Sequence, residues 1–195
     1  MSVEMSLRIV IADDESITRM DLKEMLEQND YIVVGEAEDG FDAVSACHET
    51  RPDLVLLDIK MPLLDGLSAA KIIHEEGSAK CIMLITAYSS KEFIDEAKSR
   101  GVMGYIVKPI DQKSLIPSIE VAVARSREFD TLKKSIKQQE EKLEERKLIE
   151  KAKGILMRDK GMEEHEAYGY LRDISMNKRI SMKRLAEIIV SESNQ

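Results

Sequence analysis

Three carboxylates at the ends of two apolar segments are the residues of this chain best placed to do chemistry. The segment LVLLD ends in Asp58, and IVIADD ends in Asp13 and Asp14. Short apolar runs of this kind are typical of buried strands. In an open parallel sheet, ligands bind beyond the carboxyl ends of the strands. We therefore expect Asp13, Asp14 and Asp58 to meet at one edge of such a sheet.

An acidic cluster of this kind needs a cation, because like charges within a few ångströms raise one another's pKa values. Hard oxygen ligands in a small cavity favour Mg²⁺. Two further strand-like segments end in a hydroxyl, Thr86, and an ammonium group, Lys108. The set indicates a phosphoryl-transfer site in which Asp58 is the nucleophile, while Mg²⁺ and Lys108 neutralise phosphate oxygens. The alternative is that Thr86 is an ordinary strand residue and Lys108 a solvated turn charge.

Residues 7 to about 122 resemble the receiver domain of two-component response regulators. The resemblance implies that Asp58 accepts the phosphoryl group, that Asp14 is the direct Mg²⁺ ligand and that Asp13 acts through water. It also implies that the backbone carbonyl of Lys60 completes the metal coordination. A cognate sensor histidine kinase is the implied partner. The implied chemistry is autocatalytic phosphorylation and dephosphorylation, so we do not expect an enzyme in the metabolic sense.

The same resemblance assigns roles to residues near the ends of the last two strands. Thr86 and Tyr105 correspond to the switch pair, and Lys108 to the residue that bridges acyl phosphate and metal. The bond between Lys108 and Pro109 is expected to be cis, as an X-Pro bond can be at modest cost. Thr86 and Tyr105 as plain strand residues remain the alternative.

Alternation of strands and helical segments predicts an α/β fold with a doubly wound, five-stranded parallel sheet, which is the flavodoxin-like arrangement of receivers. The strands are expected near residues 7–12, 31–36, 53–58, 81–86 and 103–107. Cys47 and Cys81 follow no metal-binding spacing and are expected to be buried thiols in a reducing cytosol. The three histidines are isolated on helical segments. No signal peptide or membrane span is recognisable, so a cytoplasmic protein is expected.

Charge divides the chain unevenly. Residues 1–110 carry 11 Lys and Arg against 21 Asp and Glu, whereas residues 111–195 carry 18 against 16. An acidic first part disfavours nucleic-acid binding there, and the basic balance of the second part permits it.

A long helix is predicted after Pro109. Ser114 is the expected N-cap, with Pro117 in the first turn, and no Gly or Pro follows until Gly154, so the helix should run for about 35 residues. Apolar residues and one glutamine recur at spacings of 3, 4, 3 and 4, which is typical of a coiled-coil seam. These residues are Phe129, Leu132, Ile136, Gln139 and Leu143. The seam indicates a parallel homodimer that forms on phosphorylation, or an extended helix that packs on its own receiver.

Three short helical patterns follow between residues 143 and 192, with turns at 159–162 and 176–181. Their apolar stripes are Leu148, Ile149, Ala152, Ile155 and Leu156; Ala167, Tyr170, Leu171 and Ile174; and Met182, Leu185, Ala186 and Ile189. About fifty residues bury little surface. We therefore expect a small three-helix bundle that gains stability from the preceding helix or from a partner.

Five basic residues gather around the last turn with a single acid, giving a net charge of +4 over residues 171–184. They are Arg172, Lys178, Arg179, Lys183 and Arg184. Lys183 and Arg184 follow the expected N-cap Ser181, where the helix macrodipole disfavours cations by roughly 0.3 to 1 kcal/mol each. Free N–H groups at a helix start together with cations suit a phosphate group. The alternative is a solvated face on which Lys183 pairs with Glu187.

Segments RKLIEKAKGILM and EAYGYLRDISMNKRISMKRLAEIIV resemble the ANTAR domain, a three-helix RNA-binding module. With the receiver, this implies a transcription antiterminator that binds hairpins in nascent leader RNA. Lys153 and Gly154 are added to the five basic residues as RNA-binding candidates. Gly154 in mid-helix costs about 1 kcal/mol relative to Ala, which close helix packing or a close nucleic-acid backbone would explain. Tyr168 either packs or stacks on an RNA base.

The expected domains are a receiver at 1–122, a helical coiled-coil linker at 123–142 and an ANTAR domain at 143–195. DNA binding is the competing function, but the outer face of the third helix offers few side chains for a major groove. A protein-interaction output is the other alternative. An output enzyme is disfavoured, because the C-terminal part lacks a nucleophile with a base or a phosphate loop.

Overall fold

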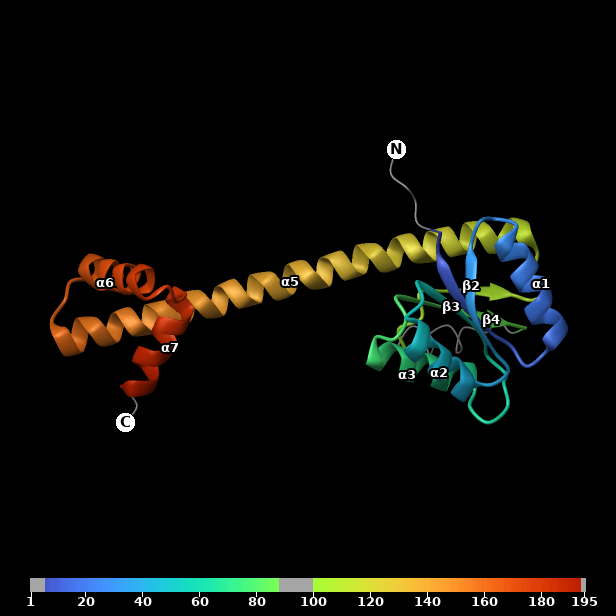
Figure 1. The fold of residues 1–195 in the computed structure, drawn as a ribbon, viewed down its shortest axis with the longest axis horizontal. Helices are drawn as coiled ribbons and strands as arrows, with labels where there is room; N and C mark the ends of the chain where they lie inside the picture. Colours follow the sequence, from blue (N-terminus) through green and yellow to red (C-terminus); the bar gives the residue numbers. More distant parts are fainter. Residues whose placement is uncertain (1–5, 88–99, 194–195) are drawn as a thin grey trace. The chain divides into compact units, whose positions relative to one another are not determined.

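The computed structural model describes residues 6–87 and 100–193 of the chain. The chain divides into two compact units, Met1–Asp130 and Thr131–Gln195. Figure 1 shows a sheet with helices in the first unit and helices alone in the second.

Parallel strands form a five-stranded sheet in the order β2-β1-β3-β4-β5. The strands are β1 (Arg8–Ala12), β2 (Ile32–Ala37), β3 (Leu54–Asp58), β4 (Cys81–Thr86) and β5 (Gly104–Val107). Every predicted strand is present, with each end within one residue of the prediction. The order reverses between β1 and β3, so the crevice where ligands bind lies beyond the ends of these two strands.

Helices cover both faces of the sheet (Figure 1). Helices α2 (Gly40–Thr50) and α3 (Gly66–Glu76) pack on the face that carries Val10 and Val55. Helix α1 (Ser16–Glu27) and the first turns of α5 pack on the other face. Because side chains alternate along a strand, β1, β3 and β4 supply apolar residues to both layers. Every residue of these three strands is buried except Arg8. The predicted doubly wound fold is confirmed.

Helix α5 (Gln112–Lys160) begins earlier and ends later than predicted. Asp111, not Ser114, takes the N-cap role, because its Oδ1 and its carbonyl both accept from the Ser114 amide, at 3.0 and 3.2 Å. Pro117 consequently lies inside the helix rather than in its first turn. The helix is 49 residues long and includes the first of the three short helical patterns. The predicted length of about 35 residues was therefore too short.

The C-terminal unit contains the last part of α5 with α6 (Glu164–Lys178) and α7 (Met182–Glu192). Its core consists of Ala152, Leu156, Ala167, Leu171, Leu185 and Ala186. Every residue of the predicted stripes is in or against this core except Ile155, which is half-buried outside it. Both predicted turns are present, and Ser181 caps α7 by accepting from the Arg184 amide at 3.1 Å.

Cys47 and Cys81 are buried in separate layers of the first unit, as predicted. Burial raises the pKa of each thiol to about 12. Among the described residues, no helix has a stretch long and apolar enough to cross a membrane.

Candidate functional site

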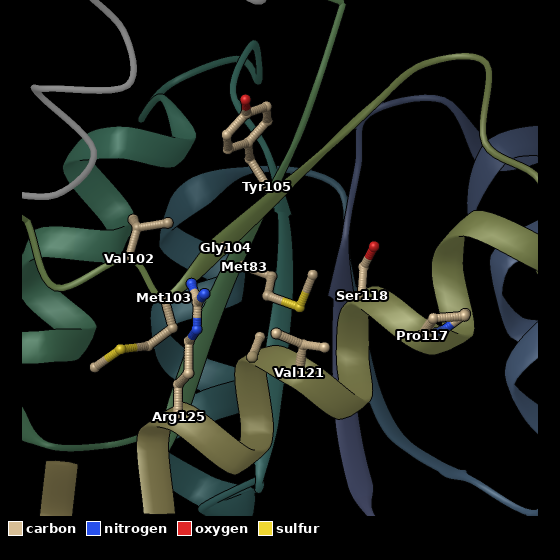
Figure 2. A pocket seen from close by; sticks show the side chains of 10 residues that line it. Met83, Val102, Met103, Gly104, Tyr105, Pro117, Ser118, Val121 and Arg125 are labelled. Carbon is tan, nitrogen blue, oxygen red and sulfur yellow. The ribbon is translucent and has the colours of Figure 1, made fainter. Parts of the chain in front are cut away.

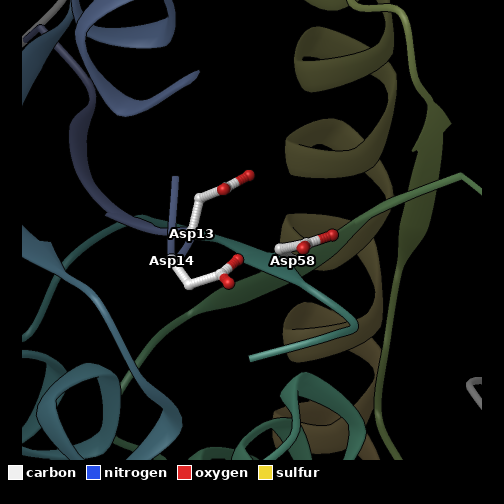
Figure 3. Close-up of side chains that lie close together, drawn as sticks. All are labelled: Asp13, Asp14 and Asp58. Atoms are coloured by element: carbon white, nitrogen blue, oxygen red, sulfur yellow. The ribbon is translucent and has the colours of Figure 1, made fainter. Parts of the chain in front are cut away.

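The three predicted carboxylates do meet at the carboxyl ends of β1 and β3. Asp13 and Asp14 follow β1, Asp58 is the last residue of β3, and one oxygen from each lies within 4.8 Å of the others (Figure 3). Asp13 and Asp58 are buried, whereas Asp14 is exposed. The cluster is therefore open to solvent on the side of Asp14, where a small charged ligand can enter.

Lys108 reaches this cluster from the end of β5. Its ammonium nitrogen lies 2.8 Å from Asp13 Oδ2 and 3.4 Å from Asp58 Oδ2. The peptide bond that follows it, to Pro109, is cis as expected. The Lys108 amide donates to the Thr86 carbonyl at 2.8 Å, which ties the end of β5 to the end of β4. Lys108 is therefore not a solvated turn charge.

The three carboxylates outnumber the one lysine that contacts Asp13 and Asp58. Burial raises the pKa of Asp58; the Lys108 charge opposes the rise and the Asp13 charge adds to it, so the net shift is upward. Burial lowers the pKa of Lys108, but the hydrogen bond to Asp13 and the charge of Asp58 outweigh burial, and the net shift is again upward. A single lysine thus leaves the cluster short of positive charge. Clustered carboxylate oxygens with an exposed member suit a hard divalent cation such as Mg²⁺.

Two features of the site were missed by the sequence interpretation. A Cβ on Gly66 would lie 2.0 Å from the Asp58 carbonyl oxygen, so only glycine lets α3 begin this close to Asp58. The preceding Asp65 caps α3 by accepting from the Ser68 amide at 2.8 Å. On the other side, Arg19 donates to the Asp13 carbonyl at 2.6 Å and helps to fix the end of β1. The dipeptide Asp65-Gly66 after a proline-containing loop was a readable signal for the first of these.

Thr86 and Tyr105 lie on the neighbouring strands β4 and β5. Thr86 is buried, and Tyr105 is 43% exposed. Leu84 pairs with Tyr105 and Thr86 with Val107, so Thr86 and Tyr105 point to the same face of the sheet. Tyr105 also lines a pocket of about 520 Å³ that extends over β5 to α5 (Figure 2). Tyr105 is therefore on the same face of the sheet as Thr86 and also at the edge of this pocket.

The predicted seam lies exposed along α5. Exposed fractions are 47% for Phe129, 61% for Leu132, 56% for Ile136 and 53% for Leu143; Gln139 is exposed as well. Ala152, at the centre of the C-terminal core, is nine residues beyond Leu143, which is about 2.5 turns at 3.6 residues per turn. The seam and the core stripe therefore occupy opposite faces of this helix. A partner on the seam would leave the C-terminal core undisturbed.

The five basic residues around the last turn are exposed or half-buried. Arg179 has φ 54°, a left-handed conformation in which Gly or Asn is usual, so a cation stands there at a cost in stability. Lys183 and Arg184 stand in the first turn of α7, against the macrodipole. Arg184 rather than Lys183 pairs with Glu187, at 3.1 Å, so the expected ion pair had the wrong basic partner. Lys178 is different, because a cation in the last turn of α6 is favourable.

Lys153 and Gly154 differ sharply. The Lys153 side chain is only 8% exposed, and its nitrogen lies 2.9 Å from Glu150 and 2.8 Å from Glu164. Its charge is thus already neutralised by two carboxylates. Gly154 is exposed, and a Cβ there would meet nothing within 4 Å. Packing within the described chain therefore does not explain this glycine.

Comparison with known proteins covers both units. Residues 9–120 match the response regulator receiver domain family, and residues 137–190 match the ANTAR domain family. The transcriptional regulatory protein PdtaR of Mycobacterium tuberculosis is 43% identical over 94% of this chain and 89% of its own length.

Solved structures resemble the first unit. A LuxR-family two-component response regulator from Aurantimonas sp. SI85-9A1 is 32% identical with a TM-score of 0.57, covering 62% of this chain and 86% of that one. The CheX-CheY complex with BeF3 and Mg²⁺ from Borrelia burgdorferi is 25% identical with a TM-score of 0.55, covering 58% of this chain and 86% of that one.

Proposed function

Because this chain belongs to the response regulators that carry a receiver domain followed by an ANTAR domain, we propose that it is a phosphorylation-controlled transcription antiterminator. In this proposal a sensor histidine kinase phosphorylates Asp58. The phosphorylated protein then dimerises and binds hairpins in nascent leader RNA. The two families are regulatory, and the phosphoryl chemistry serves only to set the state of the switch.

The acidic site supports the first step. Asp13, Asp14, Asp58 and the carbonyl of Lys60 would hold Mg²⁺, which supplies positive charge for the phosphate oxygens. Asp58 attacks phosphorus through a carboxylate oxygen while the P–N bond to the kinase's phosphohistidine breaks and its imidazole leaves, so the ionised form of Asp58 is the reactive one. The ammonium group of Lys108 lies 3.4 Å from Asp58 and donates a hydrogen bond to Asp13. It is therefore placed to bind an oxygen of the phosphoryl group once that group is on Asp58.

The surface of β5 and α5 supports the second step. Thr86 is buried at the end of β4, on the same face of the sheet as Tyr105. Movement of the Thr86 hydroxyl toward a phosphoryl group on Asp58 would free space that Tyr105 can fill. Phosphorylation shifts the equilibrium between the two conformations only by as much free energy as it stabilises one conformation more than the other. Helix α5 carries the result to the exposed seam at Leu132 and Ile136.

The RNA-binding step rests above all on Gly154. It is a helical glycine that costs stability, packs against nothing in the described chain and leaves a stretch of bare helix surface. Glycine at such a position lets a nucleic-acid backbone approach the helix closely, which a side chain would prevent. Arg179, in a left-handed conformation, and Lys183, in the first turn of α7, also stand where they reduce stability, whereas Arg184 regains part of the same cost through its ion pair with Glu187. Costly placement of these residues and of Gly154 favours a polyanionic ligand.

Substitution of Lys183 and Arg184 by Gln tests this step. The RNA probe is a stem-loop enriched by the wild-type protein from a library with a constant stem and randomised loop. Loss of two phosphate contacts should weaken binding and flatten the log-log salt slope by roughly 0.7 to 0.9 per contact. The unfolding temperature should change little, because loss of the Arg184–Glu187 ion pair, worth about 0.2–0.5 kcal/mol, is offset by removal of two cations that the macrodipole disfavours. Lys133→Gln and Lys134→Gln together, on the exposed helix outside the C-terminal core, are the matched charge control.

Duplex DNA of the same stem sequence is the competitor. The proposal expects the DNA to compete poorly. Equal affinity for DNA would favour the alternative of a DNA-binding regulator, and an unchanged salt slope in the Lys183 and Arg184 variant would remove these residues from the interface.

A further inference from the structure

Tyr168 is the exposed aromatic residue of α6 that folding does not account for. It is 47% exposed, whereas its neighbours Ala167 and Leu171 are fully buried. The other tyrosine of this helix, Tyr170, packs against the core and accepts a hydrogen bond from Lys160 at 2.9 Å. Tyr168 is therefore not a core residue, and its exposed ring is available to a ligand.

A pocket of about 450 Å³ lies beside Tyr168. It is lined by Lys153, Glu163, Glu164, His165 and Tyr168. Its volume is within the roughly 300–1,000 Å³ found for small-ligand pockets. Because an exposed tyrosine lines it, the pocket can offer an aromatic surface to a flat group.

The charges around this pocket decide what kind of group fits. Glu164 is held by Lys153 at 2.8 Å, and Glu150 pairs with the same lysine. Glu163 and Glu164 keep oxygens exposed, while the one lysine is already paired. A phosphate group would be repelled here. A neutral group with N–H donors would be accepted, because carboxylates accept from the exocyclic amino groups of bases.

We propose that this pocket binds one unpaired base of an RNA hairpin loop, stacked on Tyr168 with its exocyclic amino group directed to Glu163 or Glu164. The proposal rests on the RNA-binding function above and adds the site of base recognition. Lys153 is then a positioning residue that holds Glu164, rather than a phosphate ligand. Arg172 lies one turn beyond Tyr168 on the same face of α6, so it can hold the phosphate beside the stacked base.

A double-mutant cycle between protein and RNA tests the pocket. Full-length protein is titrated with the enriched stem-loop, and with variants in which each loop base in turn is replaced by an abasic site. Tyr168→Ala should weaken binding roughly 5- to 150-fold, the worth of one stacked base. Tyr168→Phe keeps the ring and should bind within about twofold of wild type. At one loop position, removal of the base should weaken RNA binding by wild type by a similar factor. The same removal should hardly change the affinity of the Tyr168→Ala variant.

The readouts separate this pocket from the phosphate contacts. Tyr168→Ala should leave the salt slope and the unfolding temperature unchanged, because stacking releases no counterions and the side chain is exposed. Wild-type affinity in Tyr168→Ala, or strict additivity at every loop position, would overturn the base pocket while leaving RNA binding intact. If the loop base whose removal is coupled to Tyr168→Ala is a uracil, which has no amino group, the role of the carboxylates would be overturned. No binding of any stem-loop by wild type would instead refute RNA binding itself.

Discussion

Gly154→Ala is expected to stabilise the protein and to weaken its binding to RNA. Gly154 is exposed inside α5, and an added methyl group meets nothing within 4 Å, so no clash offsets the gain in helix propensity. That gain is about 0.8 to 1 kcal/mol. The C-terminal unit has about 65 residues, and in domains of this size 1 kcal/mol raises the unfolding temperature by roughly 4–8 °C. A methyl group between helix and RNA backbone should cost about 1–3 kcal/mol of binding, as overpacking does in protein cores.

Scanning calorimetry and titration of the enriched stem-loop measure the two effects on the same preparation. Gly169→Ala is the matched control, because Gly169 is also helical and its added Cβ also meets nothing within 4 Å. Both variants should be more stable than wild type, and Gly154→Ala alone is expected to lose affinity through contact with the RNA backbone. A lower unfolding temperature for Gly154→Ala would show that the glycine is needed for packing. Higher stability with unchanged affinity would show that no backbone approaches it.

Three further outcomes are expected. Asp58→Asn should abolish labelling by a small phosphodonor in Mg²⁺, because an amide is not a nucleophile here; labelling at the wild-type rate would refute the site assignment. The double variant Leu132→Lys, Ile136→Lys should not dimerise on phosphorylation, as measured by sedimentation, although it should still be phosphorylated. An unchanged dimer would show that these residues are not in the dimer interface. Cys47 and Cys81 should resist alkylation at pH 8 until the protein unfolds, since burial raises both pKa values to about 12; rapid modification of the folded protein would contradict their burial.

The sheet and the acidic cluster were predictable because their signals are local and agree with one another. Strands β3, β4 and β5 are largely apolar runs of four to six residues, and parallel order brings the ends of such runs together. The positions of Asp58 and Lys108 could therefore be predicted from where each apolar run ends. Contacts between residues from different segments, such as Gly66 against the Asp58 carbonyl, could be seen only in the structure.

The helix start at Asp111 was less predictable, because Asp and Ser are about equally good N-caps and only the backbone decides between Asp111 and Ser114. Burial of single residues on helices was harder still. Lys153 and Gly154 are adjacent in sequence, but one is paired between two carboxylates and the other is bare. Tyr168 and Tyr170 differ in the same way. Such differences depend on how α6 lies against α5, which periodicity alone does not specify.

Sequencing of RNA crosslinked to the protein in cells tests the central claim most directly, with wild type and Asp58→Asn compared under inducing conditions. We expect crosslinks concentrated in hairpins of leader RNA upstream of terminators for wild type, and their loss in Asp58→Asn. Crosslinks scattered without regard to hairpins, or an identical pattern for Asp58→Asn, would contradict phosphorylation-controlled antitermination.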